Sequence, residues 1–230
     1  MRNTNKTLLA CLIAGALPLS AWSAGGHYPV DDADIGDAGD FGIEAWFTRV
    51  DGDNSETAFL PTWRPGAAPI ELVAGFIRVE EDGESFNRFE PAAKWQISPI
   101  EPGVAAGAVN VEAGIDDGDW NDLLVNFIGS YELTNAPVVV HANLGWIHDR
   151  GGDENLDRVF VGGAFEWGLA ESFDLIGQVY REGADEEVES QLGLRFNFDH
   201  NVEYLDLAVG RTLTGDDNDW FFTVGLGLAF

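Results

Sequence analysis

Histidines and acidic residues are the side chains of this sequence whose chemistry could go beyond packing. The four histidines, His27, His141, His148 and His200, are scattered along the chain, so their spacing does not indicate a metal centre. His148 directly precedes Asp149, a pairing that a hydrolase at a membrane surface could use. Neighbouring pairs of this kind are common by chance. We therefore predict no catalytic residue and no enzyme, and keep a surface hydrolase as the weakest alternative.

Calcium is the ion that the acidic runs could hold. Residues 51–56 read Asp-Gly-Asp-Asn-Ser-Glu, but Thr62 stands where an EF-hand loop needs its twelfth-position Glu. Residues 116–119 and 216–219 are shorter acidic clusters of a kind common in turns. We predict solvated acidic loops with no metal site and no cofactor, and leave open a weak binding of divalent cations that bridges to lipopolysaccharide.

Net charge excludes one large class of partners. The chain has 40 Asp and Glu against 12 Lys and Arg, a formal charge of −28. Nucleic acid requires a basic face that neutralises its phosphates, so we predict no nucleic-acid partner. With 15 Phe and 8 Trp, the chain carries more aromatic surface than a disordered acidic chain would, which predicts a folded protein.

Residues 1–23 are predicted to be a signal peptide. Two basic residues open the segment, and the apolar stretch at 7–19 is too short to cross a bilayer as a helix. Residues 21–23 read Ala-Trp-Ser, with small residues on both sides of a bulky one, so we expect cleavage after Ser23. Cleavage also removes Cys11, the single cysteine, and changes the formal charge from −28 to −30.

Beyond residue 40 the chain alternates with a period of two. In the last segment, residues 220–230, every second residue from Trp220 to Phe230 is large and apolar. Alternation over about ten residues is typical of a transmembrane β-strand. Phe230 stands where outer-membrane barrels carry the terminal signal for the barrel-assembly machinery, and we predict that role for it.

Similar segments precede this one, and an even number of strands returns the C-terminus to the side where the chain began. We predict an all-β fold, a transmembrane antiparallel up-and-down β-barrel of about 12 strands over residues 41–230, in the outer membrane of a Gram-negative cell. The predicted segments are 41–50, 57–64, 70–79, 87–97, 104–114, 122–132, 138–148, 158–169, 173–181, 188–198, 202–211 and 220–230.

The predicted connections alternate in character. One set is acidic and mostly contains glycine: residues 51–56, 80–85, 115–121, 149–157, 182–187 and 212–219. The other set is shorter and less charged: residues 65–69, 98–103, 133–137, 170–172 and 199–201. Because outer-membrane barrels have longer external loops and short periplasmic turns, the first set is predicted to be external and the second periplasmic.

The apolar phase of each segment is expected to face lipid, which assigns the other phase to the lumen. The predicted lumen-lining residues are Glu44, Arg88, Glu90, Lys94, Glu112, His141, Arg158, Glu166, Glu189, Arg195 and Asp206. Opposite charges among them either close part of the lumen or line a narrow channel whose acidic excess favours cations. The sequence leaves both interpretations open.

Five arginines fall in the outward phase, at or just past the external ends of odd-numbered segments: Arg49, Arg78, Arg150, Arg181 and Arg211. A charge that faces lipid is costly at the bilayer centre and almost free at the interface, so these arginines are expected at the rim. The guanidinium group suits phosphate, which predicts contact with lipopolysaccharide. Pairing with the acidic loops is an equally good interpretation.

Residues 24–40 precede the first predicted strand and are polar and acidic. We expect this segment on the periplasmic side, either entering the lumen as a partial plug or hanging free.

The start of the mature chain resembles a known family. Residues 26–34 read Gly-His-Tyr-Pro-Val-Asp-Asp-Ala-Asp, residues 39–44 read Gly-Asp-Phe-Gly-Ile-Glu, and residues 94–96 read Lys-Trp-Gln. These segments resemble the outer-membrane family named for a meta-cleavage pathway of phenol degradation. The sequence departs from that family where Tyr28 separates His27 from Pro29, and where Val30 replaces a hydroxyl residue. The resemblance implies a barrel that takes up small organic compounds, including aromatic ones.

The expected function is passive passage of small solutes through an outer-membrane channel or transporter. The expected partners are outer-membrane lipid and lipopolysaccharide, the barrel-assembly machinery and a small-molecule solute. The alternative is a non-conducting structural or surface-interaction barrel with acidic, ion-binding external loops.

Overall fold

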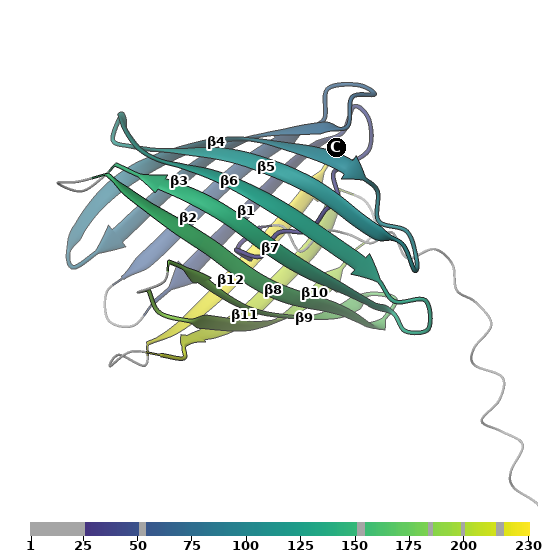
Figure 1. Cartoon of the computed structure of the whole chain (residues 1–230). Coiled ribbons are helices and arrows are strands. Elements are labelled where there is room, and N and C mark those ends of the chain that lie inside the picture. The colour runs from purple at the N-terminus through teal and green to yellow at the C-terminus, as the bar shows by residue number, and fades with distance from the viewer. Residues whose placement is uncertain (1–25, 51–53, 151–154, 184–185, 199–200, 215–218) are drawn as a thin grey trace, which may run out of the picture.

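A computed structural model of the chain describes residues 26–50, 54–150, 155–183, 186–198, 201–214 and 219–230. These residues form a single closed barrel in which each strand pairs antiparallel with the next and β12 returns to β1 (Figure 1). In this part of the chain no helix is long and apolar enough to cross a membrane. The strands are β1 (Phe41–Arg49), β2 (Ser55–Trp63), β3 (Ile70–Glu81), β4 (Glu84–Ser98), β5 (Ala105–Asp116), β6 (Asp119–Glu132), β7 (Val138–Asp149), β8 (Leu156–Ala170), β9 (Phe173–Glu182), β10 (Glu189–Asn197), β11 (Val202–Thr212) and β12 (Trp220–Ala229).

The predicted all-β barrel is confirmed, and each predicted segment coincides with one of these strands. Period-two alternation explains the agreement, because it sends the large apolar side chains of every strand to one face. That face is the outside of the barrel, where Trp95, Phe127, Leu144 and Phe222 are each more than half exposed. Exposed apolar side chains in such number require a hydrocarbon solvent.

The barrel closes where its first and last strands meet. β1 pairs with β12 from Gly42 opposite Ala229 to Arg49 opposite Phe222. The backbone N–H of Phe230 donates to the carbonyl of Phe41 at 2.9 Å. Both chain ends of the barrel therefore lie at one rim, called here the terminal end. The opposite rim is the loop end, and the role of Phe230 in assembly stays a prediction.

Two predicted external loops are wrong. Residues 80–85 and 115–121 were expected to be open connections, but β3 and β4 pair as far as Glu81 and Glu84, and β5 and β6 as far as Asp116 and Asp119. Only Asp82-Gly83 and Asp117-Gly118 remain as turns, and all four residues have positive φ. Asp-Gly is the sequence that favours two-residue turns of this geometry, whose twist matches that of the flanking strands. The loop end therefore combines tight hairpins with longer loops.

Residues 26–40, called here the inner segment, lie within the ring of strands, as the purple trace in Figure 1 shows. Tyr28, Val30, Asp32, Ala33 and Ile35 of this segment are buried. The segment therefore packs against the inner face of the wall. The predicted signal peptide, His200 and the acidic residues at 51–53 and 216–218 lie outside the described residues.

Candidate functional site

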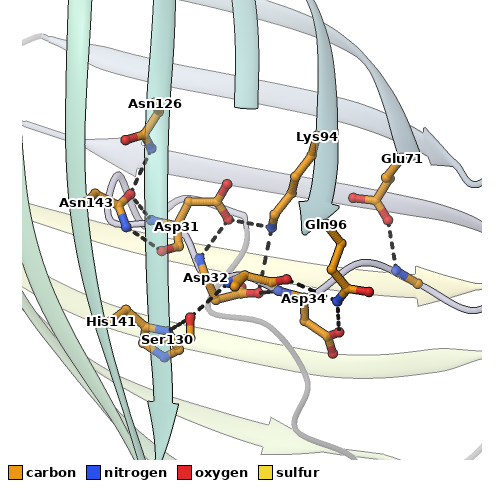
Figure 2. Close-up of polar contacts among 12 residues, drawn as sticks. Asp31, Asp32, Asp34, Glu71, Lys94, Gln96, Asn126, Ser130, His141 and Asn143 are labelled. Atoms are coloured by element: carbon orange, nitrogen blue, oxygen red, sulfur yellow. Dashed lines mark hydrogen bonds and ion pairs between the residues drawn. The ribbon is translucent and has the colours of Figure 1, made fainter. Parts of the chain in front are cut away.

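The inner segment follows the wall of the lumen and is hydrogen-bonded to one strand after another (Figure 2). Four of its backbone N–H groups donate to side chains of the wall. The N–H of Gly36 donates to Glu71 on β3 at 3.1 Å, and that of Ala33 donates to Ser130 on β6 at 2.9 Å. The N–H of Asp31 donates to Asn143 on β7 at 2.9 Å, and that of Val30 donates to Gln178 on β9 at 3.0 Å. A loop inside a protein must satisfy its backbone groups with such partners. The wall therefore supplies the hydrogen bonds that the segment cannot make with itself.

Apolar contacts fix the same segment. Val30 is fully buried against Ile147 and Phe160, and Tyr28 packs with Ile176 and Ala208. Each buried apolar side chain of this size stabilises its site by roughly 1.5–3 kcal/mol. The inner segment is thus packed into the lumen and is part of the folded core.

Glycines in the wall make room for these side chains. A Cβ added at Gly193 would lie 2.0 Å from the hydroxyl oxygen of Tyr28, and one added at Gly162 would lie 2.5 Å from Cγ2 of Val30. Neither distance is possible for real atoms. The wall and the inner segment therefore have complementary shapes, as expected for two parts that fold together.

We expect Gly193→Val to displace Tyr28 and loosen the inner segment without breaking the barrel. The measurement is protease sensitivity of the segment in refolded protein, together with the heat-resistant migration that marks a folded barrel. Gly129→Ala is the matched control, because a Cβ there meets nothing closer than 3.8 Å. If Gly193→Val and Gly129→Ala are equally resistant to protease, the shape argument is wrong.

A buried ion pair anchors the middle of the inner segment. Nζ of Lys94 lies 2.8 Å from Oδ1 of Asp31 and 3.6 Å from Oδ1 of Asp32, whose side chain has no exposed surface. Asn143 also donates to the carbonyl of Asp31 at 2.7 Å, and Asn126 donates to Asn143 at 2.8 Å. Removing one partner from such a network leaves a buried charge unpaired, which is strongly destabilising.

A second buried pair lies on β10 and β11. Arg195 donates to both carboxylate oxygens of Asp206, at 2.9 and 2.7 Å, and both side chains are almost completely buried. The Arg195 guanidinium lies 3.9 Å from the centre of the Tyr204 ring and 5.9 Å from that of Tyr28. The pair and its rings therefore join this part of the wall to the inner segment.

Two arginines near the loop end hold clusters of carboxylates. Arg88 pairs with Glu90, with Asp116 at 3.2 Å and with Asp122 at 2.7 Å. Arg158 pairs with Asp149 at 3.0 Å, and Glu182 lies 4.0 Å away from it. The positive charges of both arginines are therefore neutralised by carboxylates of the strands.

His141 forms a third buried group with Ser130 and Glu166. Its Nδ1 lies 2.8 Å from Oγ of Ser130, and its Nε2 lies 3.2 Å from a carboxylate oxygen of Glu166. Ser130 also accepts the N–H of Ala33, so the inner segment covers the group. The arrangement serves to hold the segment. Among the described residues, no group of three or more His, Cys, Asp or Glu could hold a metal ion.

The inner segment leaves a cavity of about 640 Å³ beside it. Its lining includes Asp40, Phe41 and Ala229 at the terminal end, and Thr48, Glu56 and Glu182 toward the loop end. Most of the remaining wall comes from β1 to β6. The cavity is therefore elongated along the barrel and reaches toward both rims.

The lining of this cavity is strongly acidic. It contains one lysine, Lys94, which is paired with Asp31. Burial, together with the positive charge of Arg195, lowers the pKa of the His27 ring to about 3, so His27 adds no charge at neutral pH. The eleven lining carboxylates belong to Asp31, Asp34, Asp37, Asp40, Glu44, Glu56, Glu71, Glu90, Glu112, Glu182 and Glu203.

The predicted lumen residues fall into two groups. Glu44, Glu90, Lys94 and Glu112 line the cavity. The others make the internal contacts described above or, for Glu189, accept the hydroxyl of Tyr180: Arg88, His141, Arg158, Glu166, Glu189, Arg195 and Asp206. His148, by contrast, faces outward, 30% exposed, where Nδ1 lies 2.9 Å from Asp157 and the ring stacks on Trp146.

Sequence reasoning missed the residues that hold the inner segment. Ser130, Asn143 and Gln178 are inward-phase polar residues without charge, whereas the predicted lumen residues are almost all charged. Inward-phase glycines such as Gly193 also lie outside that prediction. In the structure both kinds of residue contact the inner segment: the polar side chains accept its N–H groups, and the glycines leave space for its side chains.

A family model described as "Uncharacterised conserved protein UCP029691" matches residues 12–230. The chain belongs to this family. The match extends over the barrel and the inner segment. It does not show the narrower resemblance to the phenol-degradation family, which stays a prediction. None of the curated proteins compared with the chain matches it in sequence.

Solved structures show the same fold as this UCP029691 family member. KdgM porin in complex with disordered oligogalacturonate is similar with a TM-score of 0.67 and 12% identity, over 82% of this chain and 99% of that chain. A second structure, of KdgM porin, is similar with a TM-score of 0.65 and 13% identity, over 82% of this chain and 99% of that chain. The outer membrane protein Omp33 of Acinetobacter baumannii gives 0.50 and 8%, over 84% and 98%. The fold is therefore that of bacterial outer-membrane barrels.

Proposed function

We propose that this protein is an outer-membrane channel for the passive passage of small solutes, with a lumen that favours cations over anions. The observation that carries the proposal is the elongated cavity beside the inner segment, lined by eleven carboxylates and one lysine. The similarity to porins, rather than to enzymes, supports a channel role over a catalytic one.

The charge of the cavity is largely uncompensated. Eight of the lining carboxylates make no ion pair with another described residue: Asp34, Asp37, Asp40, Glu44, Glu56, Glu71, Glu112 and Glu203. A narrow passage with walls of low dielectric concentrates such a field and raises the local concentration of cations. Rings of carboxylates select cations in other channels by the same physics.

Aromatic side chains extend the proposal to small organic solutes. Tyr28, Phe41, Trp46, Phe160 and Tyr204 also line the cavity. A lining that combines apolar rings with a few polar groups is typical of passages and sites for small organic molecules. Oligogalacturonate, named with the similar KdgM porin, is a polyanion that this acidic lining would repel, so we expect no passage of it here.

Planar-bilayer recordings test the proposal. Under a KCl gradient we expect single-channel currents whose reversal potential has the sign of K⁺ permeation. The triple variant Asp37→Asn, Asp40→Asn and Glu56→Gln should lower the ratio of K⁺ to Cl⁻ permeability several-fold, because it removes three cavity charges. Added oligogalacturonate should leave the current unchanged.

The matched control is Glu81→Gln with Glu84→Gln, which removes exposed charges from the β3–β4 hairpin outside the cavity. It should keep the wild-type permeability ratio. A folded barrel without any current would favour the non-conducting structural protein instead. Selectivity for Cl⁻ would contradict the cation preference.

A further inference from the structure

The outer face of the barrel carries an arc of five arginines at the loop end, called here the arginine belt: Arg49, Arg78, Arg150, Arg181 and Arg211. Thr48 and Ile77 line the cavity, so the next residues, Arg49 and Arg78, point away from it. Tyr180 and Thr212 are likewise inward neighbours of Arg181 and Arg211. Arg150 directly follows β7. Between the arginine belt and the terminal end, the side chains that point outward from the strands are mostly apolar.

The belt is regularly spaced. Arg150, Arg181, Arg211, Arg49 and Arg78 belong to or follow β7, β9, β11, β1 and β3, which are alternate strands around the closed barrel. Neighbouring arginines are therefore two strands apart, about 10 Å along the wall. The belt is thus an arc that covers most of the barrel circumference.

Aromatic rings accompany the belt. The guanidinium of Arg211 lies 5.1 Å from the centre of the Trp220 ring, and that of Arg150 lies 5.7 Å from the centre of the Trp120 ring. Tryptophan rings mark the level of the membrane interface in barrels of this class. The belt is therefore at the height of lipid headgroups, directly above the apolar band.

The belt reverses the charge pattern of the rest of the molecule. The chain as a whole carries −28, yet its lipid-facing rim gathers five of the 12 Lys and Arg residues. Arg49, Arg181 and Arg211 also have partners within the protein. Arg78 shares its charge with Glu80 at 3.3 Å, but both side chains are half exposed, and pairs of this kind contribute little. Phosphate is the group that a planar guanidinium binds best at such a surface.

We propose that the arginine belt binds the phosphate groups of lipopolysaccharide in the outer leaflet. Arg49 and Arg211 form one pair of contacts, on the two sides of β12, where Arg49 is opposite Phe222 and Arg211 is opposite Trp220. Phosphates on a lipid headgroup reach both guanidinium groups while the acyl chains cover the apolar side chains below.

Native mass spectrometry of the mature chain in detergent micelles tests this inference. The probes are diphosphoryl lipid A, phosphatidylethanolamine and inorganic phosphate. We expect the wild type to retain lipid A, and the variant with all five belt arginines changed to Gln to bind it about tenfold more weakly or worse. Arg49→Gln with Arg211→Gln should produce part of this loss if the complete replacement fails to fold.

Changing Arg64→Gln at the terminal end is the control, because Arg64 contacts the Gly36 carbonyl of the inner segment and lies far from the belt. It should keep lipid A binding. Equal retention of lipid A by the wild type and the five-Gln variant would overturn the inference. So would equal binding of phosphatidylethanolamine and lipid A, or binding of inorganic phosphate alone. The ratio of K⁺ to Cl⁻ permeability should not change in the belt variants, so failure of this inference is distinct from failure of the channel.

Discussion

Deleting residues 26–38 is expected to raise the single-channel conductance about twofold or more. The inner segment packs against the wall on β5 to β11, where Val30, Tyr28 and Ala33 fill the lumen. The remaining passage is the cavity of about 640 Å³ beside it. Removing the segment opens the occupied side, so both the current and the largest neutral polymer that enters the channel should increase. Planar-bilayer recordings with polyethylene glycols of graded size measure both quantities.

Two point variants test whether the position of the inner segment controls the conductance when the segment remains in the chain. Lys94→Met leaves the segment in the chain but removes the cation that pairs Asp31 and Asp32, so we expect irregular openings toward the larger conductance. Ala38→Ser is the control, because Ala38 belongs to the same segment, is exposed and does not line the cavity. It should keep the wild-type conductance. A deletion variant that folds and conducts like the wild type would show that the segment does not limit the passage.

Replacing Arg195 by alanine is expected to lower the free energy of unfolding by about 3–5 kcal/mol. The reason is that Asp206, which has no exposed surface, would keep its charge without a counter-ion. Tyr204 and Tyr28 would also lose the guanidinium between them. Urea unfolding of the refolded protein in lipid vesicles, followed by tryptophan fluorescence, measures the loss.

The double variant Arg195→Met with Asp206→Leu isolates the charge. Because it removes both ions and keeps the volume, it should be clearly more stable than Arg195→Ala alone. Arg78→Ala is the surface comparison, and its exposed pair with Glu80 should change stability by less than about 1 kcal/mol. A loss of similar size in Arg195→Ala and Arg78→Ala would show that the buried pair does not hold the wall.

The sequence predicted the barrel well because a transmembrane strand records its environment locally. In β12 every second side chain from Trp220 to Leu228 is apolar, and no information from elsewhere in the chain is needed to assign its two faces. The same reasoning placed Glu44, Glu90, Lys94 and Glu112 on the inward phase, where they line the cavity. It failed at the β3–β4 and β5–β6 hairpins. There the acidic character of the residues predicts a loop, whereas the Asp-Gly pairs at 82–83 and 117–118 are the stronger signal for a tight turn.

Strand number, strand phase and the acidic balance are therefore properties of the sequence by itself, since each depends on neighbouring residues or on composition. The position of the inner segment and the choice of ionic partners were decided by the tertiary structure. Lys94 is 63 residues from Asp31, and Tyr204 donates to Glu44 across 160 residues. Contacts of this kind form only when the barrel has closed and distant strands face the same lumen. The spacing of residues along the sequence therefore does not predict them. That closure decides which carboxylates are neutralised and which remain to face a solute.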